Sequence, residues 1–114
     1  MAESGIEETY PVYVTEWKLT ISDRNYINDT CFKGAYVVKN ILDCYPLCEG
    51  MALFQGSDRT SEYYDSHDML YGGTGIITKD GILKPAGFAF DFLNRLLPYY
   101  IGKEENCILT TDGH

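Results

Sequence analysis

A carboxylate follows a short apolar run near the start of the chain. The run occupies positions 11–15 (PVYVT), is β-branched and aromatic, and predicts a buried strand that ends at Glu16 and Trp17. In a (β/α)8 barrel, active-site groups project from the carboxyl ends of the strands. A Glu in that place can act as the nucleophile of a retaining glycosidase, which also needs a protonated carboxyl about 5 Å away. The alternative is an ordinary solvated glutamate.

Two further segments carry polar or glycine-rich patterns. A polar stretch at 56–68 is long for a compact domain, and long loops are often functional. Its Glu62, Asp65 and Asp68 are interpreted as a solvated charge run in preference to ligands, and its His67 as an exposed loop residue. The run at 72–75 (GGTG) lacks the Gly-Lys-Ser/Thr ending of a phosphate loop, so we expect its glycines to allow a tight turn near a pocket.

The elements that position these residues alternate between strand and helix. Asn28 or Asp29 offers an N-cap for a helix of about four turns that stops before Pro46. Its expected buried stripe comprises Cys31, Gly34, Ala35, Val38, Ile41 and Leu42. A second strand is expected at 51–54.

A second helix is expected to begin at Pro85 and to end before Pro98. Its expected apolar face comprises Ala89, Phe92, Leu93 and Leu96. A last strand is expected at 107–111. The order predicts an α/β fold made of a βαβα unit with an extra strand.

Composition narrows the classes of partner. The chain has 114 residues, a formal net charge of −8 and a sequence pI near 4.5, which argues against nucleic acid and against a polybasic membrane contact. Neutral substrates such as sugars remain open. The ten Tyr, five Phe and one Trp suit sugar stacking, although aromatic residues are also ordinary core filler.

Cysteine spacing and hydropathy give expectations about compartment and cofactors. The scattered Cys31, Cys44, Cys48 and Cys107 predict free thiols in a reducing, cytoplasmic setting, with no Cys/His pairs for zinc. No signal peptide and no run of about 18 apolar residues is visible. We therefore expect neither a metal nor a cofactor.

Several motifs together resemble one enzyme family. The segment 13–17 (YVTEW) resembles the strand-seven segment of family 39 glycoside hydrolases, the β-xylosidase-like enzymes, in which that Glu is the nucleophile. The resemblance continues collinearly through 28–30 (NDT), 35–39 (AYVVK), 57–58 (SD), 71–76 (YGGTGI), 84–85 (KP) and 88–90 (FAF). It covers roughly positions 11–97, which is most of the chain.

The resemblance implies the C-terminal part of a (β/α)8 TIM barrel, with its last two β/α units at 1–101 and the start of a following β segment at 102–114. It implies Glu16 as catalytic nucleophile and Trp17, Phe54, Asp58 and Glu62 as substrate-binding residues, with a xylose-containing saccharide as partner. Trp17 is expected either beneath the sugar or at the barrel rim. The family's acid/base residue lies in an Asn-Glu-Pro motif on strand four, and this chain has no such motif, so we expect the chain alone to be an inactive fragment.

Departures from the family pattern keep a second reading open. Phe54 stands where the β-xylosidases usually have Trp, and Ser61 precedes Glu62 where they carry paired Glu, so xylose specificity is in doubt. The alternative is part of a family-39-like sugar-sensing domain of an AraC-type transcriptional regulator. A scaffold domain with no sugar role is a third reading. In each case, strands without barrel neighbours are expected to expose their edges, so the isolated chain is expected to self-associate.

Overall fold

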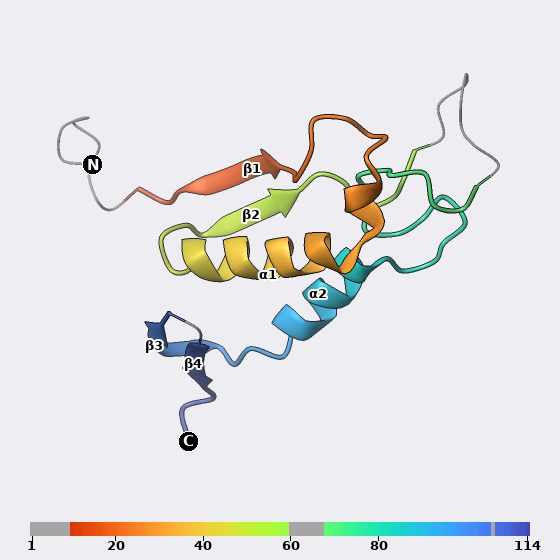
Figure 1. The fold of residues 1–114 in the computed structure, drawn as a ribbon. Helices are drawn as coiled ribbons and strands as arrows, with labels where there is room; N and C mark the ends of the chain where they lie inside the picture. Colours follow the sequence, from red (N-terminus) through yellow and green to blue (C-terminus); the bar gives the residue numbers. More distant parts are fainter. Residues whose placement is uncertain (1–9, 60–67, 106) are drawn as a thin grey trace.

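A parallel β-α-β unit forms the first half of the fold in the computed structural model, which describes residues 10–59, 68–105 and 107–114 (Figure 1). Strand β1 (Tyr13–Trp17) and strand β2 (Gly50–Leu53) lie side by side, and helix α1 (Cys31–Cys44) connects them. The helix lies along one face of the strand pair, and Trp17 and Leu53 pack against the core cluster to which its Val37 belongs. The chain is therefore α/β, as the alternating pattern predicts.

The register of the two strands aligns their carboxyl ends. Tyr13 pairs with Gly50, Val14 with Met51 and Trp17 with Leu53, with an irregularity between Val14 and Trp17. The pairing continues past both ends of β2, because the Glu49 amide donates to the Val12 carbonyl (2.8 Å) and the Phe54 amide donates to the Trp17 carbonyl (2.8 Å). The segments that follow β1 and β2 therefore leave the pair from the same edge.

Helix α1 has the predicted length but a different start. It is 14 residues long, and its N-cap is Thr30, which corrects the predicted cap at Asn28 or Asp29. Those two residues belong to a preceding 3-10 turn, η2 (Tyr26–Asp29), which is capped by the Asn25 side chain accepting from the Ile27 amide (3.2 Å). Their side chains are consequently free to make contacts far along the chain.

The buried face of α1 is rotated from the predicted stripe. Lys33, Gly34 and Val37 are buried, whereas Cys31 and Ala35 are exposed. Helix α2 crosses close to this face, so that a Cβ atom on Gly34 would lie 3.1 Å from the Pro85 carbonyl oxygen. The helix crossing therefore decides which side of α1 is covered.

Helix α2 (Pro85–Leu93) begins at the predicted proline. It ends earlier than predicted, with Asn94 as C-cap, and Phe92 is exposed rather than on the buried face. The core consists of Val37, Ala86 and Ala89, and the partly buried side chains packed on it are Trp17, Val38, Ile41, Leu53, Ile76, Phe90 and Leu93.

A hairpin ends the chain. Strand β4 (Cys107–Thr111) is the predicted last strand, and it pairs antiparallel with β3 (Tyr99–Glu104), which the sequence interpretation missed. The Lys103 ammonium donates to the Leu42 carbonyl (2.7 Å) and to Asp43 (3.2 Å), which ties the hairpin to the end of α1. The division of the chain at 101/102 stays a prediction. Within the described ranges, the longest helices are too short or too polar to cross a membrane.

Candidate active-site edge and the buried lysine–aspartate cluster

Glu16 is exposed on the penultimate position of β1, at the carboxyl edge of the strand pair. The next residue, Trp17, packs on the core, and its ring centroid lies 5.7 Å from that of Tyr36 at a tilt of 39°. Glu16 is exposed like the preceding Thr15, on the part of β1 whose register is irregular, so its carboxylate is accessible to solvent. It is solvated and free of the core.

Phe54 is the second predicted residue at this edge. It follows β2 directly, is half-buried, and is joined to Trp17 by the backbone hydrogen bond described above. The Lys18 ammonium lies 4.5 Å from the centroid of its ring, and the Arg59 guanidinium carbon lies 5.3 Å from it. Cations at these distances are attracted by the face of the ring. The edge thus combines a carboxylate, an aromatic ring and two cations.

Asp58 has a different place from the one predicted. Its side chain has no exposed surface, and its carboxylate accepts from the Lys84 ammonium (3.0 and 3.1 Å) and from the Gly75 amide (2.7 Å). These enclosed contacts give Asp58 a structural role in this chain, and its assignment as a sugar-binding residue stays a prediction. Glu62, Asp65 and His67 lie outside the described residues, so the prediction for Glu62 stays a prediction.

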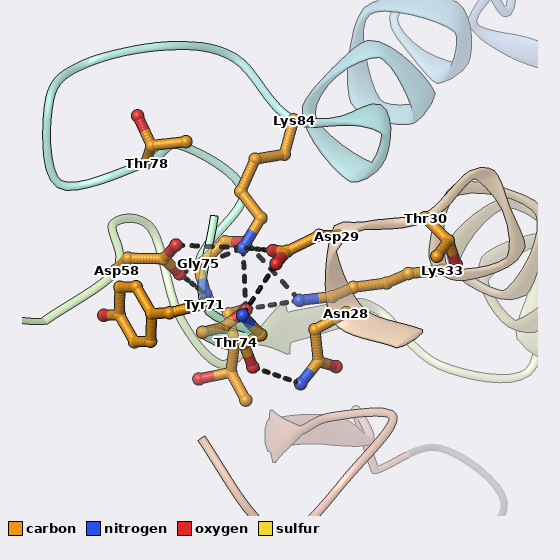
Figure 2. Close-up of polar contacts among 12 residues, drawn as sticks. Asn28, Asp29, Thr30, Lys33, Asp58, Tyr71, Thr74, Gly75, Thr78 and Lys84 are labelled. Carbon is orange, nitrogen blue, oxygen red and sulfur yellow. Dashed lines mark hydrogen bonds and ion pairs between the residues drawn. The ribbon is translucent and has the colours of Figure 1, made fainter. Parts of the chain in front are cut away.

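Lys84 stands at the centre of a buried cluster that brings together four segments of the chain (Figure 2). Besides Asp58, its ammonium contacts Asp29 at 2.5 Å and donates to the Gly73 carbonyl at 2.7 Å. Each of the two buried carboxylates is thereby paired with the Lys84 ammonium, as burial of charge requires. The cluster therefore joins the end of η2, the segment after β2, the glycine run and the start of α2.

Lys33 approaches the same cluster from α1. It is fully buried, and its ammonium donates to the Thr74 carbonyl and lies 3.5 Å from the Gly75 carbonyl. Burial, followed by repulsion from Lys84, lowers the pKa of Lys33 to about 8, and the attraction of Asp58, Asp29 and Asp23 opposes this shift. Because the Thr74 and Gly75 carbonyls hold this buried ammonium, Lys33 fixes the position of the glycine run relative to α1.

The glycine run makes a turn, as its composition suggested, and it also lies in close contact with Asp58. Gly72 has a φ of 82°, and its amide donates to Asp29 (2.7 Å). Its carbonyl accepts from the side-chain amide of Asn28 (2.9 Å). A Cβ atom on Gly73 would collide with the Asp58 carboxylate, and one on Gly75 would collide with the Asp58 backbone. The glycines are therefore required by contact with the cluster as well as by the turn.

Sequence reasoning missed the cluster. From the sequence, we interpreted Lys84, Asn28, Asp29 and Thr74 as parts of motifs or as helix caps, and we gave Lys33 no role. A usable signal was present, since Lys33 lies one turn before Val37, on what is otherwise an apolar face. Among the described residues, no group of three or more His, Cys, Asp or Glu side chains is placed to hold a metal ion.

Comparisons with known proteins agree with the resemblance in the motifs. No family model matches the chain. A β-xylosidase from Caldicellulosiruptor saccharolyticus is 34% identical over 97 residues, covering 82% of this chain and 20% of that protein. A β-xylosidase from Geobacillus stearothermophilus is 25% identical over 100 residues, covering 88% of this chain and 20% of its own length.

A solved structure gives the same result for the fold. The GH39 β-xylosidase from Caulobacter crescentus superimposes with a TM-score of 0.79 at 27% identity, covering 92% of this chain and 24% of that one. The chain spans about a fifth of the length of the curated relatives that it matches.

Proposed function

Since the chain is β-xylosidase-like, of the glycoside hydrolase family 39 type, we propose that it supplies the nucleophile side of a retaining glycosidase site. In this proposal, β1, α1, β2 and α2 are the last two β/α units of a (β/α)8 barrel, and the rest of the barrel comes from a longer protein. The parallel pairing of β1 and β2 with α1 on one face supports this assignment.

The observation that carries the proposal is the place of Glu16. It is exposed at the carboxyl end of a parallel strand, and the segment after β2 leaves the sheet at the same edge. Attack by a carboxylate on the anomeric carbon breaks the glycosidic bond and forms a covalent glycosyl-enzyme, while the general acid protonates the leaving oxygen. Water, deprotonated by that same group, then displaces the carboxylate and releases the sugar. The general acid must lie about 5 Å away, and we propose that it comes from the remainder of the longer protein.

We propose that the substrate is a xyloside-like saccharide. Phe54 offers a ring beside the Trp17 backbone, and Lys18 and Arg59 surround that ring with hydrogen-bond donors suited to sugar hydroxyls. Glu62 remains a proposed sugar contact, and Trp17 is proposed to form the rim beneath the edge, because its ring packs on Tyr36. All four cysteines are free thiols, which supports a proposed reducing, cytoplasmic location.

The test is an aryl-xyloside hydrolysis assay on the full-length protein and on two variants. Glu16→Gln keeps the size of the side chain and removes the anionic nucleophile, so we expect a loss of roughly a thousandfold or more in kcat. Glu49→Gln is the matched control, because Glu49 is an exposed glutamate at the opposite edge, directly before β2. It should leave the rate unchanged. The 114-residue chain alone should show no turnover.

The outcomes separate the two readings of the sequence. An active protein that is equally active as Glu16→Gln would remove Glu16 from the mechanism. Saturable sugar binding without turnover, measured by titration calorimetry, would support the sugar-sensing domain of an AraC-type regulator instead. Neither binding nor turnover would contradict both.

A further inference from the structure

The hydroxyl of Thr74 lies between the two segments that leave the active-site edge. Thr74 has no exposed surface. Its hydroxyl donates to the Asp23 carboxylate (2.9 Å) and accepts from the Gln55 side-chain amide (3.2 Å). Asp23 belongs to the segment that follows β1, and Gln55 belongs to the segment that follows β2. A single side chain therefore joins both.

The buried cluster holds Thr74 on both sides. Its own carbonyl accepts from Lys33, the preceding Gly73 carbonyl accepts from Lys84, and the following Gly75 amide donates to Asp58 (Figure 2). With three consecutive residues tied to buried groups, the Thr74 hydroxyl has a defined position. Bonds made to it transmit that position to Asp23 and Gln55.

The two segments carry the residues of the edge. Gln55 directly follows Phe54, and the segment with Asp23 begins after Glu16 and Trp17. The Phe54 amide donates to the Trp17 carbonyl (2.8 Å), so this hydrogen bond reports directly on how closely the two strand ends are held together.

We propose that Thr74 is a positioning residue: its hydroxyl sets the spacing between the ends of β1 and β2 and thereby the placement of Phe54 relative to Glu16. The inference rests on the proposed function only in giving the edge a role in a reaction. The contacts of Thr74, and the spacing that they set, are tested without any substrate.

The experiment compares substitutions of two buried threonines, Thr74 and Thr78, in the full-length protein. Thr74→Val keeps shape and removes the hydroxyl. Thr78→Val is the control, since Thr78 is equally buried and its hydroxyl accepts only from the Ile82 amide (3.0 Å), within its own turn. Hydrogen exchange of the Phe54 amide should accelerate by roughly tenfold in Thr74→Val, which corresponds to the loss of two hydrogen bonds. It should be unchanged in Thr78→Val.

Two further variants separate positioning from general loss of stability. Thr74→Ser keeps the hydroxyl and should restore slow exchange at Phe54. Gln55→Met removes one partner, and its effect on exchange should not add to that of Thr74→Val, because both break the same link. The accessibility of Trp17, the only tryptophan in the sequence, to a fluorescence quencher should increase in the variants in which exchange at Phe54 accelerates and stay unchanged in the others.

Equal exchange at Phe54 in Thr74→Val and Thr78→Val would overturn the inference, as would full additivity with Gln55→Met. Because no readout is an activity, failure here is distinguishable from failure of the proposed reaction. If Thr74→Val is unfolded, amides throughout the chain will exchange rapidly. The inference is then tested by the other two variants: exchange at Phe54 should stay slow in Thr74→Ser and accelerate in Gln55→Met, and equal rates in these two variants would overturn it.

Discussion

The carboxyl edge of β1–β2 and the buried cluster around Lys84 both contain charged residues, but their surroundings differ. Glu16 is exposed near the end of a strand, whereas the Lys84 and Asp58 side chains are at most 1% exposed and bonded to each other. A buried charge has to be matched by partners, and those partners leave it no capacity for a ligand. The difference teaches that burial commits the charges of the cluster to the fold, whereas exposure leaves the Glu16 carboxylate accessible to a ligand.

The largest effect is expected at the centre of the cluster. Lys84→Met would remove the ammonium that is bonded to both the Asp29 and the Asp58 carboxylate, which is expected to lower the free energy of unfolding by about 3–5 kcal/mol. Lys39→Met is the control, because the Lys39 side chain is 76% exposed and pairs only with Asp43, so its change should stay within about 0.5 kcal/mol. Urea unfolding of the three proteins measures both values. Similar curves for Lys84→Met and Lys39→Met would refute the comparison.

The second effect concerns pH. The pKa of Lys33 is lowered from 10.5 to about 8 by burial, so between these values the unfolded chain binds more protons than the folded one. Stability from this group therefore rises as pH increases from about 8 toward 10.5, by up to about 3 kcal/mol, and its cost is fully present below pH 8. Denaturant unfolding of the native chain and of Lys33→Met between pH 7 and 10 isolates the group. A constant difference between the two proteins across that range would be the contrary result.

A third test concerns the backbone approach within the cluster. Gly75→Ala would push a methyl group into the backbone of Asp58, and we expect a loss of about 2 kcal/mol in the free energy of unfolding. Gly56→Ala is the matched control, because a Cβ atom there meets nothing within 4 Å. Its stability should change by no more than about 0.5 kcal/mol. Thermal unfolding monitored by circular dichroism is sufficient, and equal melting temperatures for the two variants would contradict the described packing.

The smallest effect on stability is expected at the edge. Glu16 is exposed, so Glu16→Gln should alter the free energy of unfolding by no more than about 0.5 kcal/mol, measured by urea unfolding alongside Glu49→Gln. Together with the activity assay, this separates a chemical role from a structural one. A strongly destabilised Glu16→Gln protein would mean that the carboxylate belongs to the fold.

Much of the fold could be predicted because it is local. The apolar runs at 11–15 and 51–54 correspond to β1 and β2, displaced by one or two residues, and Pro85 begins α2 because its missing N–H costs nothing at a first helical position. The cap of α1 was predicted wrongly, since Asn28 and Asp29 are good caps in isolation but bond to Gly72 in the structure. Strand β3 was missed although Tyr99, Tyr100 and Ile101 are residue types that favour strands, and its antiparallel pairing with β4 identifies it in the structure.

The sequence by itself determined the α/β order of elements, the family resemblance and the carboxylate that follows the first strand, since periodicity and motif are written along the chain. Only the tertiary structure decided which polar residues are buried. Asp29, Asp58 and Lys84 are separated by 26 residues or more, and nothing in their local patterns distinguishes them from solvated charges. The packing of α1, the glycine run and α2 against one another brings these three residues together. A charge that is buried must be paired, so the three form one group of ion pairs instead of remaining solvated.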